Sequence, residues 1–144
     1  MVGDVRDADT VRRARRGVDA VVHLAARVGV GQNMYEVEEY TAVNTLGTAV
    51  LLEALAAQPV KKLVVASGMS IYGEGRYVDA AGRPKQCVGR SSEQLRRGDW
   101  EVRDASGQAL RPAPTPETKR PSLPSVYALS KYDQERLCLM LGAA

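Results

Sequence analysis

A tyrosine and a lysine lie four residues apart in the stretch Ser125–Lys131, as Tyr127 and Lys131. On a helix, residues four apart lie on the same face, so both side chains would enter the same space. A lysine ammonium within a few ångströms of a phenol favours the phenolate, and a phenolate can take a proton from an alcohol near neutral pH. The pair therefore indicates proton abstraction from a hydroxyl group, although an ordinary amphipathic helix can carry the same spacing.

The elements that must position this pair alternate along the chain. The expected strands are short apolar runs at 1–5, 18–26 and 62–67. The expected helices are 8–16, with Asp7 as its N-cap and Gly17 after its end, 35–57, and the segment that begins near Tyr127. Val-rich runs of strand length fit a sheet buried on both faces. The alternation predicts an α/β fold with a parallel sheet and right-handed crossovers.

Residues 73–125 differ in composition from the rest of the chain. Six of the seven prolines and several glycines fall there. A loop of this length inside a compact domain is usually functional or disordered. We expect an insertion on the substrate side of the domain, with one or two helical turns at 91–97 and a strand of a small hairpin at 99–103.

Composition limits the class of protein. The 144 residues suit one domain, with 44% apolar and 26% charged residues, a net charge of +3 and no apolar run near the ~20 residues of a membrane span. No signal peptide precedes the acidic start, so we expect a cytoplasmic protein. Four arginines between 12 and 16 form a solvated helix face rather than a nucleic-acid site, because aromatic residues are only 5%. Cys87 and Cys138 form neither a disulfide framework nor a metal site.

Five segments, in chain order, resemble motifs of the extended short-chain dehydrogenase/reductase family, the NAD-dependent nucleotide-sugar epimerases and dehydratases. They are Gly3–Asp7, Val22–Ala26, Val43–Thr48, Ser67–Gly73 and the Tyr127/Lys131 pair. The resemblance covers the chain except for 73–125, and it implies a partial Rossmann-like, doubly wound sheet. An unrelated α/β nucleotide binder would require all five matches to arise by chance.

The resemblance also implies a cofactor, NAD, and a nucleotide-sugar substrate. Tyr127 would be the base, and Lys131 would hold the nicotinamide ribose. The residues expected at the cofactor are Asp4, Val5, Leu24, Ala25, Ala26, Asn44, Ser67, Tyr127 and Lys131, and those expected at the substrate are Ser67 and Ser70. His23 reads better as a packed strand residue than as an acid or base, and Asn44 better as a backbone-bonding residue than as a catalyst.

The sequence departs from the family pattern in three ways. The Gly-x-x-Gly-x-x-Gly turn that receives the cofactor pyrophosphate is absent, and so is the region that follows the Tyr-Lys helix in the family, so we expect a central fragment. Gly68 stands where the family has a serine or threonine hydroxyl at the sugar, a loss that could cost ~10²-fold in rate. Met69 and Ser70 replace the Asp-Glu pair of the dehydratases, which favours an epimerase or reductase.

Two functions remain open from the sequence. The first is an epimerase-type enzyme of which this chain is the central part. The second is a truncated or degenerate module that binds NAD or a nucleotide sugar without catalysis, which Gly68 favours. The resemblance makes a homodimer plausible for the complete protein, through the helices that contain Asn44 and Tyr127.

Overall fold

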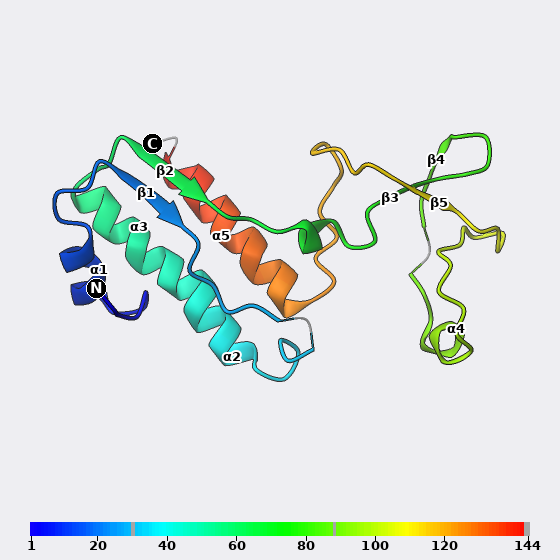
Figure 1. Cartoon of the computed structure of the whole chain (residues 1–144), viewed down its shortest axis with the longest axis horizontal. Helices are drawn as coiled ribbons and strands as arrows, with labels where there is room; N and C mark the ends of the chain where they lie inside the picture. Colours follow the sequence, from blue (N-terminus) through cyan, green and yellow to red (C-terminus); the bar gives the residue numbers. More distant parts are fainter. Residues whose placement is uncertain (30, 88, 143–144) are drawn as a thin grey trace. The chain divides into compact units, whose positions relative to one another are not determined.

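A computed structural model describes residues 1–29, 31–87 and 89–142. The chain divides into two compact units (Figure 1). One consists of Met1–Ile71 and Leu123–Ala144, and the other is Tyr72–Ser122.

The first unit is an α/β layer built on two parallel strands. Its elements are α1 (Ala8–Ala14), β1 (Ala20–His23), α2 (Val37–Tyr40), η1 (Thr41–Leu46), α3 (Gly47–Ala57), β2 (Lys62–Val65) and α5 (Val126–Gly142). Strand β1 pairs with β2 from Ala20↔Lys62 to His23↔Val65. The crossover helix between them, α3, runs beside α5, and both lie behind the strands in the view of Figure 1. The parallel α/β architecture expected from the sequence is confirmed.

The core lies between this helical layer and one face of the strands. Its members are apolar side chains of α1 and α3, Val11, Leu51, Ala54 and Leu55, with Val21, Val50, Val60 and Leu63 packed against them. The other face of the strands is open in the described residues, because Val22 is 62% and Val64 43% exposed. The layer is therefore covered by helices on one face.

Helix α1 begins where its sequence predicts, after Asp7, but it ends at Ala14, two residues earlier than expected. The Asp7 carboxylate accepts hydrogen bonds from the backbone N–H groups of Asp9 and Thr10, and the Thr10 hydroxyl bond is the main reason that the pKa of Asp7 is lowered. Gly17 follows the helix with φ +73°, a conformation that glycine adopts without strain.

The strand expected at 1–5 is not formed, and this prediction is wrong. Those residues pair with neither β1 nor β2. Val5 instead lies against the start of α3, where a Cβ on Gly47 would approach Val5 Cγ1 to 2.5 Å. Gly47 is therefore required by this close contact.

The helix expected at 35–57 spans 37–57 and contains a widened turn. Its middle section, η1, is a π-helix, which is rare and often marks a functional site. By length and composition Val37–Ala57 could cross a membrane, but helices buried in a core pass the same test, and this one packs on α1 and α5.

The second unit is a small antiparallel sheet with one short helix. Its elements are β3 (Arg76–Val78), β4 (Pro84–Lys85), α4 (Ser92–Arg96) and β5 (Arg111–Ala113), with strand order β4-β3-β5. Helix α4 confirms the expected helical turns. The expected strand at 99–103 is wrong, since only an isolated bridge joins Arg103 to Ala109.

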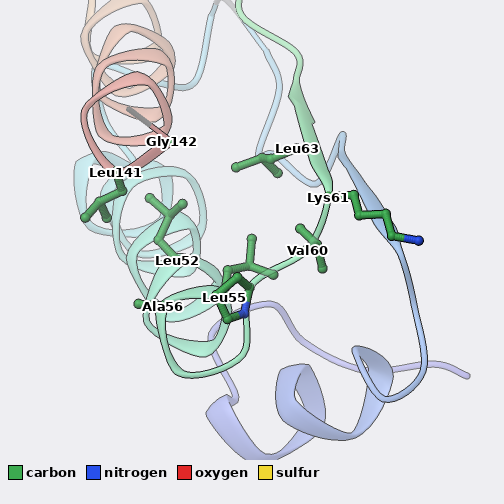
Figure 2. Close-up of a pocket in the computed structure, with 9 residues that line it drawn as sticks. Leu52, Leu55, Ala56, Val60, Lys61, Leu63, Leu141 and Gly142 are labelled. Carbon is green, nitrogen blue, oxygen red and sulfur yellow. The ribbon is translucent and has the colours of Figure 1, made fainter. Parts of the chain in front are cut away.

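An apolar pocket of about 530 Å³ opens near the C-terminal ends of α3 and α5 (Figure 2). Its lining includes Leu52, Leu55, Leu63 and Leu141. None of the lining residues belongs to the site expected from the sequence, so this pocket is separate from the expected active site.

Candidate active site

Several of the expected site residues follow the carboxyl ends of the two parallel strands. Leu24, Ala25 and Ala26 follow β1 directly, and Ser67 follows the end of β2 by two residues. In open α/β sheets, ligands bind outside the carboxyl ends of the strands. The first half of α5 contributes Tyr127 and Lys131, and α5 contacts β2.

The start of α5 is fixed by two side chains. Ser125 Oγ accepts from the backbone N–H of Ala128 at 3.1 Å, and Asn33 Oδ1 accepts from the backbone N–H of Tyr127 at 3.1 Å. Asn33 is fully buried. These bonds satisfy N–H groups that a helix start leaves without intrahelical partners, and they set the position of Tyr127.

Tyr40 is a site residue that sequence reasoning missed. It is 0% exposed, and its ring packs edge-on against Tyr127 with centroids 6.2 Å apart. Its hydroxyl donates to the Gly29 carbonyl at 3.0 Å, which ties the loop after β1 to α2. The available signal was its four-residue spacing from Asn44, which places both on one helix face.

Lys131 is buried, with 3% of its surface exposed. Its ammonium donates to Gln134 Oε1 at 2.5 Å. Burial lowers the pKa of Lys131, and the nearby Cys138 thiol opposes this shift. In the described part of the chain this ammonium makes no hydrogen bond to Tyr127, so the direct pairing expected from the sequence stays a prediction.

Asn44 lies in the π-helix and joins three parts of the unit. Its Oδ1 accepts from the Arg27 backbone N–H at 2.6 Å, and its Nδ2 donates to the Arg27 carbonyl at 3.1 Å and to Ser130 Oγ at 2.9 Å. Ser130 Oγ in turn donates to the Tyr127 carbonyl at 3.0 Å. Asn44 thus holds the loop after Leu24–Ala26 against the turn of α5 that carries the predicted base.

The segment after β2 contains two serines beside Gly68. Ser67 Oγ donates to Glu135 Oε2 at 2.7 Å. Ser70 Oγ is buried and has no hydrogen-bond partner in the described residues. A Cβ on Gly68 would meet Ser70 Oγ at 3.6 Å and Lys131 Cγ at 3.9 Å. Position 68 therefore faces the free Ser70 hydroxyl and Lys131, with room for a small side chain.

Asp4 and Val5 lie in the segment that precedes α1. Both carboxylate oxygens of Asp4 accept from Arg6, at distances from 2.7 to 3.1 Å. These bonds lower the pKa of Asp4 to about 2, so it is ionised at neutral pH. An ionised carboxylate keeps acceptor capacity beyond one guanidinium, which suits the place at the cofactor that the resemblance implies for Asp4.

His23 ends β1 and is 4% exposed. Its Nε2 lies 2.8 Å from Thr48 Oγ1 and 3.1 Å from Gln134 Nε2. Burial, followed by the charge of Lys131, lowers the pKa of His23. The ring is therefore neutral near pH 7, and its burial agrees with the packed role expected from the sequence.

Comparison with known proteins defines the class. The family model of the NAD dependent epimerase/dehydratase family matches residues 1–91. The chain belongs to this family.

Individual relatives agree with this assignment. A dTDP-L-rhamnose 4-epimerase of Burkholderia thailandensis is 31% identical over 121 residues, covering 83% of this chain and 32% of the relative. A UDP-glucose 4-epimerase of Streptomyces lividans is 38% identical over 96 residues, covering 62% and 29%. The solved Thermus thermophilus UDP-glucose 4-epimerase complex with NAD superimposes with a TM-score of 0.66 at 28% identity, covering 98% and 35%. The chain thus spans about a third of the length of the curated relatives it matches.

Proposed function

We propose that this chain supplies the base and the cofactor ribose site of an NAD-dependent epimerase acting on a nucleotide sugar. The observation that carries the proposal is that α5, which contains Tyr127, contacts β2, and that its buried Lys131 is joined through Gln134 to the Ala25 carbonyl just after β1. The solved relative named above was obtained with NAD, and the two curated relatives are named as 4-epimerases of nucleotide sugars.

In the proposed mechanism, Tyr127 takes the proton from a sugar hydroxyl at its phenolic oxygen and returns it when the hydroxyl is re-formed. Lys131 stabilises the phenolate with its positive charge. Bound NAD would supply a reversible hydride acceptor for the carbon that carries this hydroxyl. An epimerase in addition lets the sugar turn over between the two transfers, so that the second transfer inverts the carbon.

The residues present fit part of the cofactor. Lys131 is a buried donor toward a ribose, Asp4 is an ionised acceptor toward adenine, and Ser70 Oγ is a buried hydroxyl without a partner. An unpaired buried hydroxyl has a free-energy cost that a bound hydroxyl or carbonyl would remove. Ser70 is therefore our candidate for the bond to the sugar that Gly68 cannot make, with Ser67 held toward Glu135.

The test begins with NAD titration of the 144-residue chain by calorimetry, with far-UV circular dichroism to confirm folding. We expect saturable binding that is retained in Tyr127→Phe and lost in Lys131→Met. In the longest chain that turns over a nucleotide sugar, Tyr127→Phe should abolish epimerisation. Turnover unaffected by that substitution would remove Tyr127 from its role.

A second candidate function, binding without catalysis, is favoured by Gly68. The two functions are separated by Gly68→Ser, which the open space at this position accommodates. A rise in rate of about 10²-fold would identify a weakened catalyst. Binding with no gain in rate would favour the binding module. Ser70→Ala is the matched control, because it removes the hydroxyl that we propose as the substitute.

Two further features belong to this proposal. We place the protein in the cytoplasm. We also expect a homodimer of the complete protein through α5 and the long helix that contains Asn44 in η1, which is supported by exposed apolar side chains such as Leu46 of η1 and Leu129 and Leu139 of α5. Sedimentation velocity measures this state, and Leu129→Glu with Leu139→Glu should shift a dimer to monomer.

A further inference from the structure

One backbone carbonyl, that of Gly29 after β1, accepts hydrogen bonds from two buried side chains. The Tyr40 hydroxyl donates to it at 3.0 Å, and Asn33 Nδ2 donates to it at 3.4 Å. Tyr40 and Asn33 are both 0% exposed. Water cannot replace a bond lost at such a site, so a hydroxyl or amide left without this carbonyl would carry a free-energy cost. The carbonyl therefore holds both side chains in place.

Gly29 has the backbone conformation and the small size that this arrangement needs. Its φ is +148°, which residues with a side chain rarely adopt. A Cβ at this position would lie 2.8 Å from the Tyr40 hydroxyl oxygen and 2.7 Å from Gln32 Oε1. A larger residue would therefore push the Tyr40 hydroxyl away from the carbonyl.

The same two side chains contact Tyr127 at two different points. Asn33 Oδ1 accepts from the Tyr127 backbone N–H at 3.1 Å. The Tyr40 ring meets the Tyr127 ring at a centroid distance of 6.2 Å and an interplanar angle of 83°. Gly29, Asn33, Tyr40 and Tyr127 thus form a closed set of contacts, the Gly29 cluster, in which each member touches two others. One member of such a buried set cannot shift without loosening the rest.

The cluster supplies what the start of α5 lacks. Tyr127 is the second residue of α5, and the first N–H groups of a helix have no partner within the helix. Asn33 provides that partner from outside, and the edge-to-face contact with Tyr40 limits the planes that the Tyr127 ring can take. Both the backbone and the ring of Tyr127 are therefore held by residues outside α5.

We propose that Tyr40 is a positioning residue for Tyr127, which acts through its ring and through the Gly29 carbonyl and Asn33. The segment after β1 and the predicted base are then assembled before a ligand binds. This inference rests on the proposed function for the role of Tyr127 as base. The Gly29 cluster stands without that role, and the two are tested separately.

The first experiment is amide hydrogen exchange, read by NMR, on the 144-residue chain with Tyr40→Phe. This change keeps the ring and removes the hydroxyl that bonds the Gly29 carbonyl. Because Asn33 is then held less firmly, the Tyr127 N–H should exchange about tenfold faster. The Ala128 N–H, which Ser125 Oγ accepts at 3.1 Å, should keep its rate. An unchanged rate at Tyr127 would overturn the proposal. An equal increase at Ala128 would also overturn it, since the whole start of α5 would then be fraying.

Two further variants make this comparison specific. Tyr35→Phe makes the same change at a tyrosine that is 89% exposed, and it should alter neither rate. An effect as large as that of Tyr40→Phe would overturn the proposal. Asn33→Leu removes the acceptor and should abolish the protection of the Tyr127 N–H, and protection that survives would overturn the cluster. Should Asn33→Leu not fold, Tyr40→Phe decides alone.

Turnover tests the positioning role, in the longest chain that turns over a nucleotide sugar. We expect Tyr40→Phe to lower kcat about tenfold and to leave KM nearly unchanged, because Tyr40 contacts the base and a small misplacement of a reacting group slows the reaction. Unchanged kcat, in an enzyme that Tyr127→Phe inactivates, would overturn the positioning role. Activity retained in Tyr127→Phe would instead contradict the proposed function and leave the Gly29 cluster in place.

Discussion

The unit that carries the candidate site buries polar side chains, whereas 72–122 keeps most of its own at the surface. In the first unit, buried polar residues from β1, α3 and α5 bond to one another, and they include His23, Thr48 and Gln134. Among the described residues of 72–122 the buried polar residue is Asp79, and the hydrogen bonds of its carboxylate come from Ala81 and Arg83, within four residues in the same turn. One unit is held by bonds between distant elements and the other largely by local ones.

Charge is divided in the same way. Residues 72–122 contain ten lysines and arginines against seven acidic residues, so the net charge of +3 lies in this unit. The remaining residues carry equal numbers of each sign. A basic surface attracts an anion over distances of several ångströms, while fixed hydrogen bonds set its final orientation. We therefore expect 72–122 to be the unit with the stronger attraction for anions at low salt, and the α/β unit to be the one that fixes side chains by hydrogen bonds.

The largest expected effect comes from creating a cavity in each unit, which tests whether the two units are stabilised separately. Leu52 is 4% exposed on α3, and Leu110 is 3% exposed in 72–122. Each leucine-to-alanine change should cost about 2–5 kcal/mol in the unit that contains it. Hydrogen exchange read by mass spectrometry should speed up in the first unit for Leu52→Ala and within 72–122 for Leu110→Ala. Faster exchange everywhere in both variants would show a single cooperative structure.

A smaller effect separates long-range from local polar bonds. Asn44→Ala would leave both backbone groups of Arg27 without their partner and should lower the free energy of unfolding by about 2–3 kcal/mol. Asp104 also bonds two backbone N–H groups, but at the surface. Asp104→Ala should have a much smaller effect because water replaces the lost bonds. Urea unfolding of both variants measures the difference. Equal losses in the free energy of unfolding would show that the buried bonds of Asn44 stabilise the protein no more than the surface bonds of Asp104.

The pH dependence of stability gives a further measure of burial in the first unit. The pKa of His23 is lowered on folding, so below about pH 6.5, the value in an unfolded chain, the unfolded state binds more protons. Stability should therefore fall as the pH decreases from about 6.5 toward the folded pKa. His23→Gln should flatten urea midpoints between pH 7 and pH 5. The carboxyl groups whose pKa is lowered titrate below this pH range. An unchanged pH dependence of the urea midpoint in His23→Gln would show that another group takes up the proton.

The smallest expected effect is an ion pair of the other unit. Arg97 pairs with Glu93 on α4 at 3.0 Å, with side chains 66% and 78% exposed. Arg97→Ala should change stability by about 0.5 kcal/mol or less, and the difference should shrink in 1 M salt. Thermal melts at low and high salt measure it. A larger, salt-independent loss would show that α4 depends on this arginine for packing.

Much of the α/β unit could be predicted from local pattern. Val-rich runs gave β1 and β2, and capping by Asp7 located α1. The segment at 1–5 has strand composition, but in the described residues it pairs with neither strand and packs on Gly47 instead. Composition shows whether a run can be a strand, whereas pairing depends on a neighbour that the sequence does not reveal.

The sheet of 72–122 was harder to predict for a different reason. Strands β4 and β5 contain Pro84 and Pro112, and proline in a run normally argues against a strand. Both lie on edge strands of the order β4-β3-β5, where a missing N–H is tolerated.

In the candidate site, Tyr127 and Lys131 could be found from their spacing, but the buried residue that bonds to Lys131 could not. Tyr127 and Lys131 follow a recognisable pattern. Gln134 lies three residues beyond Lys131 and looks like a surface residue of an amphipathic helix. Its burial depends on the end of β1 and the start of α3, which are more than 80 residues away in sequence.

The π-helix at Thr41–Leu46 sets the rotational phase between the two halves of one long helix. Each residue in an α-helix advances the direction of the side chain by about 100°. Deleting one residue from this turn would restore regular α-helix but rotate Tyr40 away from Gly29, while Thr48 stayed beside His23. The extra residue therefore acts as a spacer, and it lets a single helix present one side chain to the loop after β1 and another to the strand itself.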